Sequence, residues 1–283
     1  MKKITVNANA KINLFLEVNE RLPNGYHDLQ SIMQAVSLCD VLHIEVDESG
    51  DFKLDCPKIE CDLKDNLIYK AAMAFYSHSG IPFTGLDVKV EKNIPACAGL
   101  AGGSTDAAAI LKGLNDLYDT PFSNAELRNI GETIGADVPF CIMGGTAVAK
   151  GIGEILTPVS GIPDCYIVIS IGNSGVSTKW AFEQLDSIEN RAICSVESIT
   201  ASIEKSSLGD ICRDLYNVFE SVSPYDTEIK DIMKNCGALG TLMSGSGPSV
   251  FSVFDNKQLA ENSVNALNEK GYSAFLCTPQ NNI

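Results

Sequence analysis

One short run of small residues constrains this chain more than any other segment. Residues 95–108 read PACAGLAGGSTDAA, and three glycines and two alanines fall within residues 97–104. Glycines let a backbone approach a ligand closely, and the free N–H groups at a helix start favour an anion, most often a phosphate. A helix is expected directly after Ser104, because apolar residues recur there at helical spacing: Ala107, Ile110, Leu111, Leu114 and Leu117. The segment predicts a phosphate-binding loop rather than a plain helix lead-in.

The loop does not belong to the commonest classes of phosphate loop. The sequence contains no Gly-Lys dipeptide, which excludes a Walker A loop, and no complete Gly-x-Gly-x-x-Gly. A second glycine cluster, MSGSGPS at residues 243–249, lies between two expected strands. It is either a hairpin turn or a loop packed near a ligand. Its extra serine and glycine favour the ligand loop, because two residues suffice for a hairpin.

Two charged residues stand in apolar surroundings. Lys11 lies in AKINL and Asp137 in GADVPF. A lysine on an apolar strand is costly unless it is paired or its ammonium reaches water. An aspartate before Val-Pro is, by itself, most often a turn or helix-terminating residue. With a phosphate loop, the two would form a phosphoryl-transfer set, although their spacing does not place them together.

Composition limits the class of protein. Formal net charge is −15 and pI is near 4.6, which argues against a general binder of nucleic acid or anionic membranes. The 283 residues, with 45% hydrophobic and 20% charged, predict a globular protein of two domains. We expect the boundary near residue 155, where glycines and prolines cluster, giving domains 1–155 and 156–283.

Other features point to a reduced, cytoplasmic protein. No apolar run approaches the roughly 18 residues of a membrane span. Polar residues after the basic start argue against a signal peptide: Asn7, Asn9, Lys11 and Asn13. The ten cysteines form no Cys-x-x-Cys pair, and the chain has only three histidines, so a zinc site is not expected. Most of the cysteines are interpreted as buried, reduced thiols.

Periodicity and capping patterns predict alternating strands and helices, and hence an α+β or α/β fold. Asp65 is expected to cap a helix, and Ser123 with Glu126 forms a capping box. Strands are expected over 3–18, 41–47, 86–92, 145–149, 165–171, 239–243, 249–254 and 272–277. Helices are expected after residue 104 and over 65–79, 123–134, 178–186, 196–205, 212–220, 225–234 and 256–269.

Several of these segments resemble the GHMP kinase superfamily. The loop at 95–108 is similar to its second motif, and GTLMSGSGPSVF at 240–251 to its third. Other matches resemble the branch that phosphorylates a cytidine diphosphate-linked methylerythritol in non-mevalonate isoprenoid synthesis. They are AKINLFLEV at 10–18, RLPNGYHDLQSIM at 21–33, DNLIYKAA at 65–72, GADVPFCIMGGTAVAKGIGE at 135–154 and GVSTKWAF at 175–182.

The chain also departs from the family pattern. Ala101 stands where glycine is common, and Cys97 replaces another small residue. Residues 186–238 resemble the family only loosely. The resemblance implies a two-domain α+β fold, with an N-terminal domain like the second domain of ribosomal protein S5 and a ferredoxin-like C-terminal domain. It further implies that ATP and substrate bind between the two domains.

The resemblance also implies roles for individual residues. Asp137 would accept the proton of the substrate's 2-hydroxyl, and Lys11 would orient Asp137 and offset developing charge. Asn13 would position the hydroxyl. Tyr26 and Phe182 would sandwich the cytosine, and His27 would read its edge. Mg²⁺ would bridge ATP oxygens with a contact to Ser104. ATP would bind Asn66, Leu67, Lys92, Pro95, Ala96, Cys97, Ala98, Gly99, Leu100, Ala101, Gly102, Gly103, Ser104, Thr105 and Asp106.

Two alternatives stay open at this point. The chain would be another small-molecule GHMP kinase, such as a homoserine or mevalonate kinase, or a non-catalytic nucleotide sensor with the same fold. Tyr26, His27 and Phe182 favour a nucleobase substrate, and the presence of both Asp137 and Lys11 argues against the sensor. The expected partners are the two small-molecule substrates, with no nucleic acid and no membrane, in a monomer or homodimer.

Overall fold

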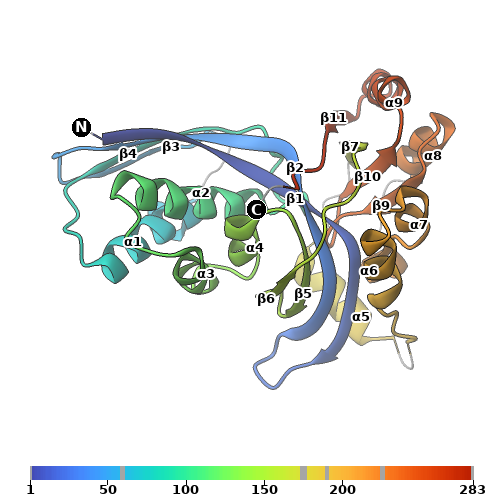
Figure 1. Ribbon diagram of the computed structural model, residues 1–283, viewed down its shortest axis with the longest axis horizontal. Coiled ribbons are helices and arrows are strands. Elements are labelled where there is room, and N and C mark those ends of the chain that lie inside the picture. The colour runs from blue at the N-terminus through green and yellow to red at the C-terminus, as the bar shows by residue number, and fades with distance from the viewer. Residues whose placement is uncertain (1, 58–60, 173–176, 189–190, 224–226, 282–283) are drawn as a thin grey trace. The chain divides into compact units, whose positions relative to one another are not determined.

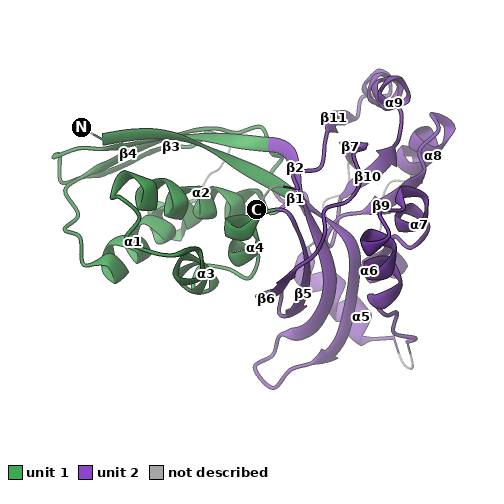
Figure 2. Ribbon diagram, viewed as in Figure 1, with its two compact units in different colours: residues 1–10, 39–96, 101–144 green, residues 11–38, 97–100, 145–283 purple. Residues whose placement is uncertain are grey.

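The protein consists of two compact units (Figure 2). The computed structural model describes residues 2–57, 61–172, 177–188, 191–223 and 227–281. Unit 1 comprises residues 1–10, 39–96 and 101–144, and unit 2 comprises residues 11–38, 97–100 and 145–283. Two 20-residue strands, β1 (Lys2–Arg21) and β2 (His27–Val46), contribute to both units. The units therefore do not coincide with segments 1–155 and 156–283, and that domain boundary stays a prediction.

Unit 1 packs helices against a small sheet, with the helices gathered on one face of its strands (Figure 1). Strand β4 pairs antiparallel with β2, from Val41 opposite Glu91 to Val46 opposite Leu86, and parallel with β3. The strands follow the order β3-β4-β2-β1. The remaining elements of unit 1 are β3 (Phe52–Asp55), β4 (Leu86–Glu91), a 3₁₀ turn (Leu63–Asp65), α1 (Leu67–Ser79), α2 (Gly102–Leu117), α3 (Asn124–Glu132) and α4 (Val138–Met143).

The core of unit 1 follows from strand and helix periodicity. Leu86, Val88 and Val90 alternate with exposed or half-buried residues along β4, so one face of that strand is buried. Helix α2 is buried over most of its surface and uses alanines where its neighbours approach closely. Phe75 of α1 is fully buried in the same cluster. The capping box of Ser123 and Glu126 is confirmed at the start of α3.

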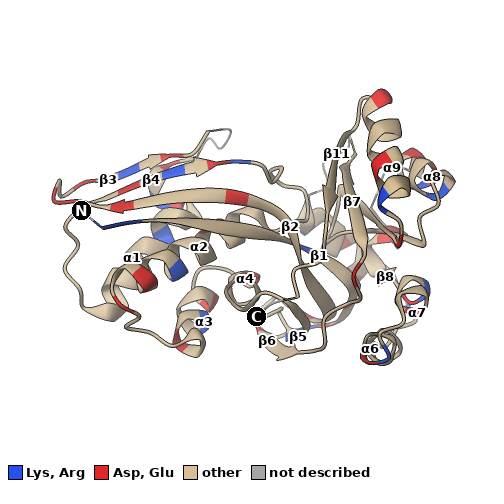
Figure 3. Cartoon of the chain, turned by 45° about the horizontal axis from the view of Figure 1, so that its top comes forward, with Lys and Arg blue, Asp and Glu red and all other residues tan. Residues whose placement is uncertain are grey.

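The edge strand of unit 1 is charged. Strand β3 lies at the end of the sheet order, and its exposed positions are Lys53 and Asp55. Figure 3 shows residues of both charge signs along β3 and β4. Charges on an edge strand oppose pairing with another chain.

Unit 2 contains the remaining halves of β1 and β2 and a separate antiparallel sheet. Strand β5 pairs with β2 and β6, and β8 pairs with β1 through Phe15 opposite Tyr216. The separate sheet has the order β11-β7-β10-β9. Bounds are β5 (Thr146–Gly151), β6 (Ile155–Pro158), β7 (Tyr166–Ile171), β8 (Tyr216–Asn217), β9 (Gly240–Met243), β10 (Ser249–Phe254), β11 (Ser273–Cys277), α5 (Thr178–Asp186), α6 (Glu197–Glu204), α7 (Leu208–Arg213), a 3₁₀ turn (Val218–Ser221), α8 (Thr227–Asn235) and α9 (Lys257–Glu269).

Strand β10 is the centre of that separate sheet and is buried along its whole length. Its Val250 and Phe254 pack with Ile229 and Met233 of α8 and Leu267 of α9. Its sequence, SVFSVF, also buries two serines, Ser249 and Ser252, among the apolar residues.

Two expectations about local structure are wrong. The helix expected over 212–220 is absent, since α7 ends at Arg213 and β8 and a 3₁₀ turn follow. Asn66, not Asp65, caps α1. The strand expected over 41–47 is confirmed, as the end of the much longer β2, which finishes at Val46. Residues 225 and 226 of the expected helix 225–234, and residues 175 and 176 of the GVSTKWAF motif, lie outside the described residues.

The cysteines are less buried than expected. The ten, all within the described residues, form no disulfide, yet only Cys165, Cys212 and Cys277 are buried, whereas Cys61 and Cys97 are exposed. Burial raises the pKa of Cys165 and of Cys212 to about 12, so these two stay protonated thiols. Among the helices of the described residues, none is both long and apolar enough to cross a membrane.

Candidate functional site

The backbone of the glycine loop turns repeatedly into the left-handed region. Cys97, Gly99 and Ala101 have φ of 53°, 73° and 60°. Alternate residues of opposite backbone handedness point successive N–H groups toward a common concavity that suits an anion. Two of the three positions are not glycine, so the loop adopts this shape at a conformational cost. The departures at Cys97 and Ala101 therefore leave the loop geometry in place.

The N-terminus of α2 follows the loop directly. Its N-cap residue is Ala101, which has no side chain able to cap the helix. The Thr105 N–H is the first backbone N–H of the helix to bond to the cap residue, and it donates to the Ala101 carbonyl at 2.9 Å. The preceding amides, at Gly102, Gly103 and Ser104, therefore receive no cap from Ala101, and such amides are suited to bind an anion.

The two glycine clusters of the sequence contact each other within unit 2. The Ser244 hydroxyl donates to the Gly99 carbonyl at 3.1 Å. A Cβ at Gly99 would lie 2.3 Å from the Ser244 carbonyl oxygen, and one at Gly245 would lie 3.1 Å from the Gly99 Cα. Asn217 supports the second loop, because its amide donates to the carbonyls of Met243 and Gly245 at 2.7 and 2.8 Å. The cluster at 243–249 is thus a packed loop as well as a strand connection.

Lys11 is part of a buried polar chain on β1. Its Nζ donates to Asn13 Oδ1 at 2.8 Å, and Asn13 Nδ2 donates to the Ser31 hydroxyl at 2.9 Å. Ser31 in turn donates to the Phe15 carbonyl at 2.7 Å. Lys11 and Asn13 are 5% and 2% exposed. The Lys11 backbone N–H also donates to the Leu100 carbonyl of the glycine loop at 3.2 Å. The structure thus brings together two sequence-predicted residues, Lys11 and Asn13.

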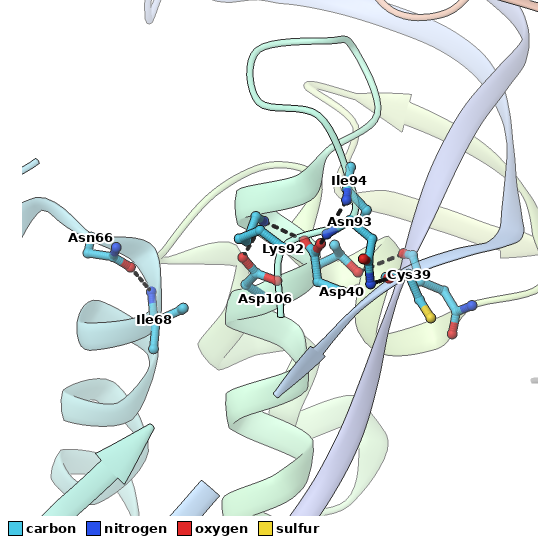
Figure 4. A network of polar contacts seen from close by, with 10 residues as sticks. Cys39, Asp40, Asn66, Ile68, Lys92, Asn93, Ile94 and Asp106 are labelled. Atoms are coloured by element: carbon cyan, nitrogen blue, oxygen red, sulfur yellow. Dashed lines mark hydrogen bonds and ion pairs between the residues drawn. The ribbon is translucent and has the colours of Figure 1, made fainter. Parts of the chain in front are cut away.

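Lys92 lies between two carboxylates in unit 1 (Figure 4). Its Nζ donates to Asp106 Oδ2 at 2.8 Å and makes a short contact with Asp40 Oδ2. Asp40 Oδ1 also accepts from the backbone N–H groups of Asn93 and Ile94 at 2.6 and 2.8 Å. All three charged side chains are at most 4% exposed. Asp40 was not among the sequence-predicted site residues, because it lies 52 positions from Lys92.

The three charges of this cluster leave one carboxylate oxygen without a partner. Within the described residues, Asp106 Oδ1 is buried and accepts no hydrogen bond. Burial raises the pKa of Asp106 to about 7, against the opposing effect of Lys92. Burial would lower the pKa of Lys92, but the charges and hydrogen bonds of Asp106 and Asp40 outweigh it and raise that pKa. The ammonium thus stays charged, while burial weakens the acidity of Asp106.

Asn66 and Leu67 lie at the start of α1. Asn66 is its N-cap, and its Oδ1 accepts from the Ile68 N–H at 2.9 Å (Figure 4). Leu67 approaches α2, because a Cβ at Gly103 would lie 3.4 Å from Leu67 Cδ1. These two expected nucleotide contacts therefore lie beside the N-terminus of α2, within unit 1.

Asp137 is the N-cap residue of α4, which confirms its position at a turn. Its side chain makes no capping hydrogen bond to that helix. The helix instead begins Val138-Pro139, and proline suits a first turn because its missing N–H is not needed there.

The three aromatic residues expected to bind cytosine do not all meet. The rings of His27 and Phe182 stack with centroids 4.7 Å apart, and Phe182 also packs edge-on against Phe219 at 4.9 Å. Tyr26 is 61% exposed. One face of Phe182 is therefore covered by His27. His27 also bonds to Asp186, a residue that sequence reasoning missed because the two lie 159 positions apart.

Family models match both parts of the chain. Residues 66–145 match the GHMP kinases N terminal domain, and residues 199–273 match the GHMP kinases C terminal model. The chain belongs to the GHMP kinase family. The first match contains the glycine loop and Asp137, and the second contains the MSGSGPS loop. The α+β expectation and the GHMP kinase fold are thereby confirmed.

Curated relatives of this GHMP kinase share one name. A 4-diphosphocytidyl-2-C-methyl-D-erythritol kinase from Caldicellulosiruptor bescii is 43% identical over 88% of this chain and 89% of its own length. Another from Acetivibrio thermocellus is 38% identical over 98% of this chain and 99% of its own. The chain is an ATP-dependent small-molecule kinase, as the family and these relatives establish.

Solved structures of GHMP kinases have the same fold. A crystal structure of 4-(cytidine 5'-diphospho)-2C-methyl-D-erythritol kinase superposes with a TM-score of 0.78 at 30% identity, covering 98% of this chain and 99% of that one. A homoserine kinase from Cytophaga hutchinsonii reaches a TM-score of 0.76 at only 17% identity, covering 100% and 96%. The second likeness shows the fold alone.

Proposed function

We propose that this GHMP kinase transfers the γ-phosphoryl group of ATP to the 2-hydroxyl of 4-diphosphocytidyl-2-C-methyl-D-erythritol. The observation that carries the proposal is the 38–43% identity, over most of the chain, to relatives that bear this enzyme name. The residues GYH at 25–27 and GADVP at 135–139, which distinguish this branch, support it. The reaction is one step of isoprenoid precursor synthesis.

To catalyse this reaction, the enzyme has mainly to position the two substrates and to neutralise the charge on the transferred phosphoryl group. The hydroxyl attacks the γ-phosphorus in line with the leaving oxygen of ADP, and the γ-phosphoryl carries its charge on three equatorial oxygens. In our proposal, Asp137 accepts the hydroxyl proton, and Asn13 orients the hydroxyl through its side-chain amide. Lys11 offsets the negative charge that develops. The Lys11–Asn13 hydrogen bond supports a joint role, because it holds both groups in one geometry.

We propose that ATP binds along the loop 95–104. The left-handed turns at Cys97, Gly99 and Ala101 and the N-terminus of α2, which Ala101 does not cap, support a phosphate position there. Asn66, Leu67, Lys92 and Asp106 would contact the nucleoside. The unpartnered Asp106 Oδ1 supports this, since a hydrogen-bond donor of the nucleoside would satisfy it.

Mg²⁺ would be held chiefly by ATP oxygens and water. In the part of the chain that the structure describes, no three His, Cys, Asp or Glu side chains form a metal-binding group. This donor set fits a hard cation that keeps several waters and takes few protein ligands. We propose the Ser104 hydroxyl as the protein ligand. Mg²⁺ neutralises phosphate charge when it is bound.

The test is ADP formation with each of three acceptors. We expect turnover with ATP and 4-diphosphocytidyl-2-C-methyl-D-erythritol, and none above background with homoserine or mevalonate. Turnover with homoserine or mevalonate instead would establish another GHMP kinase activity. Binding of ATP without turnover of any acceptor would establish a nucleotide sensor. A cytoplasmic location and a monomeric or homodimeric state stay predictions.

A further inference from the structure

Two side chains of helix α5 hold the imidazole of His27, and all three residues belong to unit 2. Phe182 and Asp186 are four residues apart, so they lie on the same face of α5. The Phe182 ring stacks on the imidazole with an interplanar angle of 22°, and Asp186 Oδ1 lies 2.7 Å from His27 Nε2. The His27 side chain is only 9% exposed. Stacking and hydrogen bonding together therefore fix both the plane and the rotation of the ring.

The bond to Asp186 also decides which ring nitrogen carries a hydrogen. An ionised carboxylate can only accept, so a hydrogen bond at this distance requires the hydrogen to be on Nε2. In a neutral imidazole this leaves Nδ1 as an acceptor. Among the described residues, the bond to Asp186 is the hydrogen bond found for this ring. His27 thus offers a fixed acceptor beside the exposed Tyr26.

We propose that Asp186 is a specificity-determining positioning residue: it makes His27 Nδ1 an acceptor for the exocyclic amine of cytosine and so disfavours uracil. The inference rests on the proposed function and on the role that the family resemblance implies for Tyr26 and His27, which is to bind the base. Cytosine presents an amine at the ring position where uracil presents a carbonyl oxygen. An acceptor facing a carbonyl leaves two lone pairs opposed and unpaired, and unpaired buried polar groups give strong discrimination.

The Asp186 side chain is too exposed for its burial to contribute much to folding. Its side chain is 40% exposed, and partly exposed ion pairs contribute little to stability. Removal of the carboxylate should therefore leave a folded protein in which the imidazole is free to change its hydrogen position. The same helix offers a matched control, Glu183, whose 58% exposed side chain pairs with Lys179 at 3.9 Å.

The test compares kcat/KM for the cytidine substrate and its uridine analogue. We expect Asp186→Ala to lower the cytidine-to-uridine preference by about 10-fold, the order set by one hydrogen bond between neutral groups. Asp186→Asn should do the same, because its amide can donate to Nε2 and shift the hydrogen to Nδ1. KM for ATP should stay unchanged in both variants. Glu183→Gln should keep the wild-type preference.

A spectroscopic readout separates positioning from structure. The chain has three histidines, so nitrogen chemical shifts of His27 can be assigned by comparison with a His27→Gln variant. We expect the hydrogen on Nε2 in the wild type and a mixture of both forms in Asp186→Ala. An unchanged preference or an unchanged nitrogen pattern in Asp186→Ala would overturn the inference. So would a parallel loss of thermal stability and of both substrate affinities, which marks a structural role.

The same experiment distinguishes failure of the proposed function. If the wild type forms no ADP with either the cytidine or the uridine substrate, the proposed function fails, and the inference fails with it. If the wild type prefers the cytidine substrate and Asp186→Ala keeps that preference, only the inference fails.

Discussion

The Gly99 carbonyl accepts a hydrogen bond from the Ser244 hydroxyl at 3.1 Å, although the two residues are 145 positions apart. The contact joins the two glycine-rich loops that the sequence offers separately. It also explains why residue 99 must be glycine. The backbone there has φ of 73°, and a Cβ would lie 2.3 Å from the Ser244 carbonyl oxygen.

Gly99→Ala should therefore damage both stability and nucleotide binding. The left-handed conformation and the overlap together should lower the free energy of unfolding by about 1–3 kcal/mol. Displacement of the loop should raise KM for ATP. Gly209→Ala in α7 is the control, because nothing lies within 4 Å of its Cβ. Urea unfolding and ATP kinetics of both variants check this, and a Gly99→Ala enzyme with wild-type values would contradict the packing described.

Ala101→Gly should raise the free energy of unfolding, whereas an alanine-to-glycine change usually lowers it. Ala101 has φ of 60°, a conformation that costs an L-residue about 1–2 kcal/mol and costs glycine nothing. After the entropy that glycine loses on folding, we expect a gain of up to about 1 kcal/mol in unfolding free energy. Ala125→Gly on the exposed face of α3 should instead lose about 1 kcal/mol. Equal losses in the two variants would show that Ala101 is unstrained.

Local signals predicted local structure well. Ser123 and Glu126 form the expected capping box, and α5 spans the expected residues 178–186. The error at 212–220 has a nonlocal cause. Tyr216 and Asn217 pair with Phe15 and Leu16 of β1. A partner strand 201 positions away, as from Phe15 to Tyr216, leaves no local periodicity that could predict it.

The residues of the candidate site likewise fall into those that the sequence could predict and those that it could not. The glycine loop could be predicted because its small residues are contiguous, and Lys11 and Asn13 because they share one face of one strand. Asp40, Asn217 and Asp186 could not, since each acts on a group far away in sequence. Asp40 has an ordinary strand context, and only the fold places it against Lys92. A buried lysine should nevertheless prompt a search for carboxylates elsewhere in the chain.

Asp106 should make stability depend on pH. Burial raises its pKa to about 7, well above the ordinary value of an aspartate, so the folded state binds this proton more strongly than the unfolded state. Its favourable contribution is complete below about pH 4 and is lost as pH rises through about 7. Relative to Asp106→Asn, the wild type should lose unfolding free energy over that range, by at most about 1.4 kcal/mol per pH unit. Urea unfolding of both proteins across the range checks this. A difference that does not vary with pH would contradict the raised pKa.

Asp137→Asn should fold normally and lose most turnover. The change is isosteric, so the side chain keeps its size and shape and the fold should be preserved. Loss of a general base should lower kcat by about 10²- to 10⁴-fold. Asp116→Asn, an exposed aspartate of α2, is the control. Turnover within about threefold of the wild type would remove Asp137 from the proposed mechanism.

Lys11→Met tests whether the buried ammonium acts on the transition state. Methionine keeps the apolar stem, so it removes chiefly the charge and the bond from Nζ to Asn13. If Lys11 offsets charge that develops during transfer, kcat should fall by about 10²- to 10³-fold while KM for ATP changes little. Lys89→Met, at an exposed position of β4, should leave both constants unchanged. Ser31→Ala removes the hydroxyl that accepts from Asn13 and donates to the Phe15 carbonyl. It should lower kcat by less than Lys11→Met, because Ser31 is joined to Lys11 through Asn13. A rise in KM with kcat unchanged would instead make Lys11 a ground-state ligand of the phosphates.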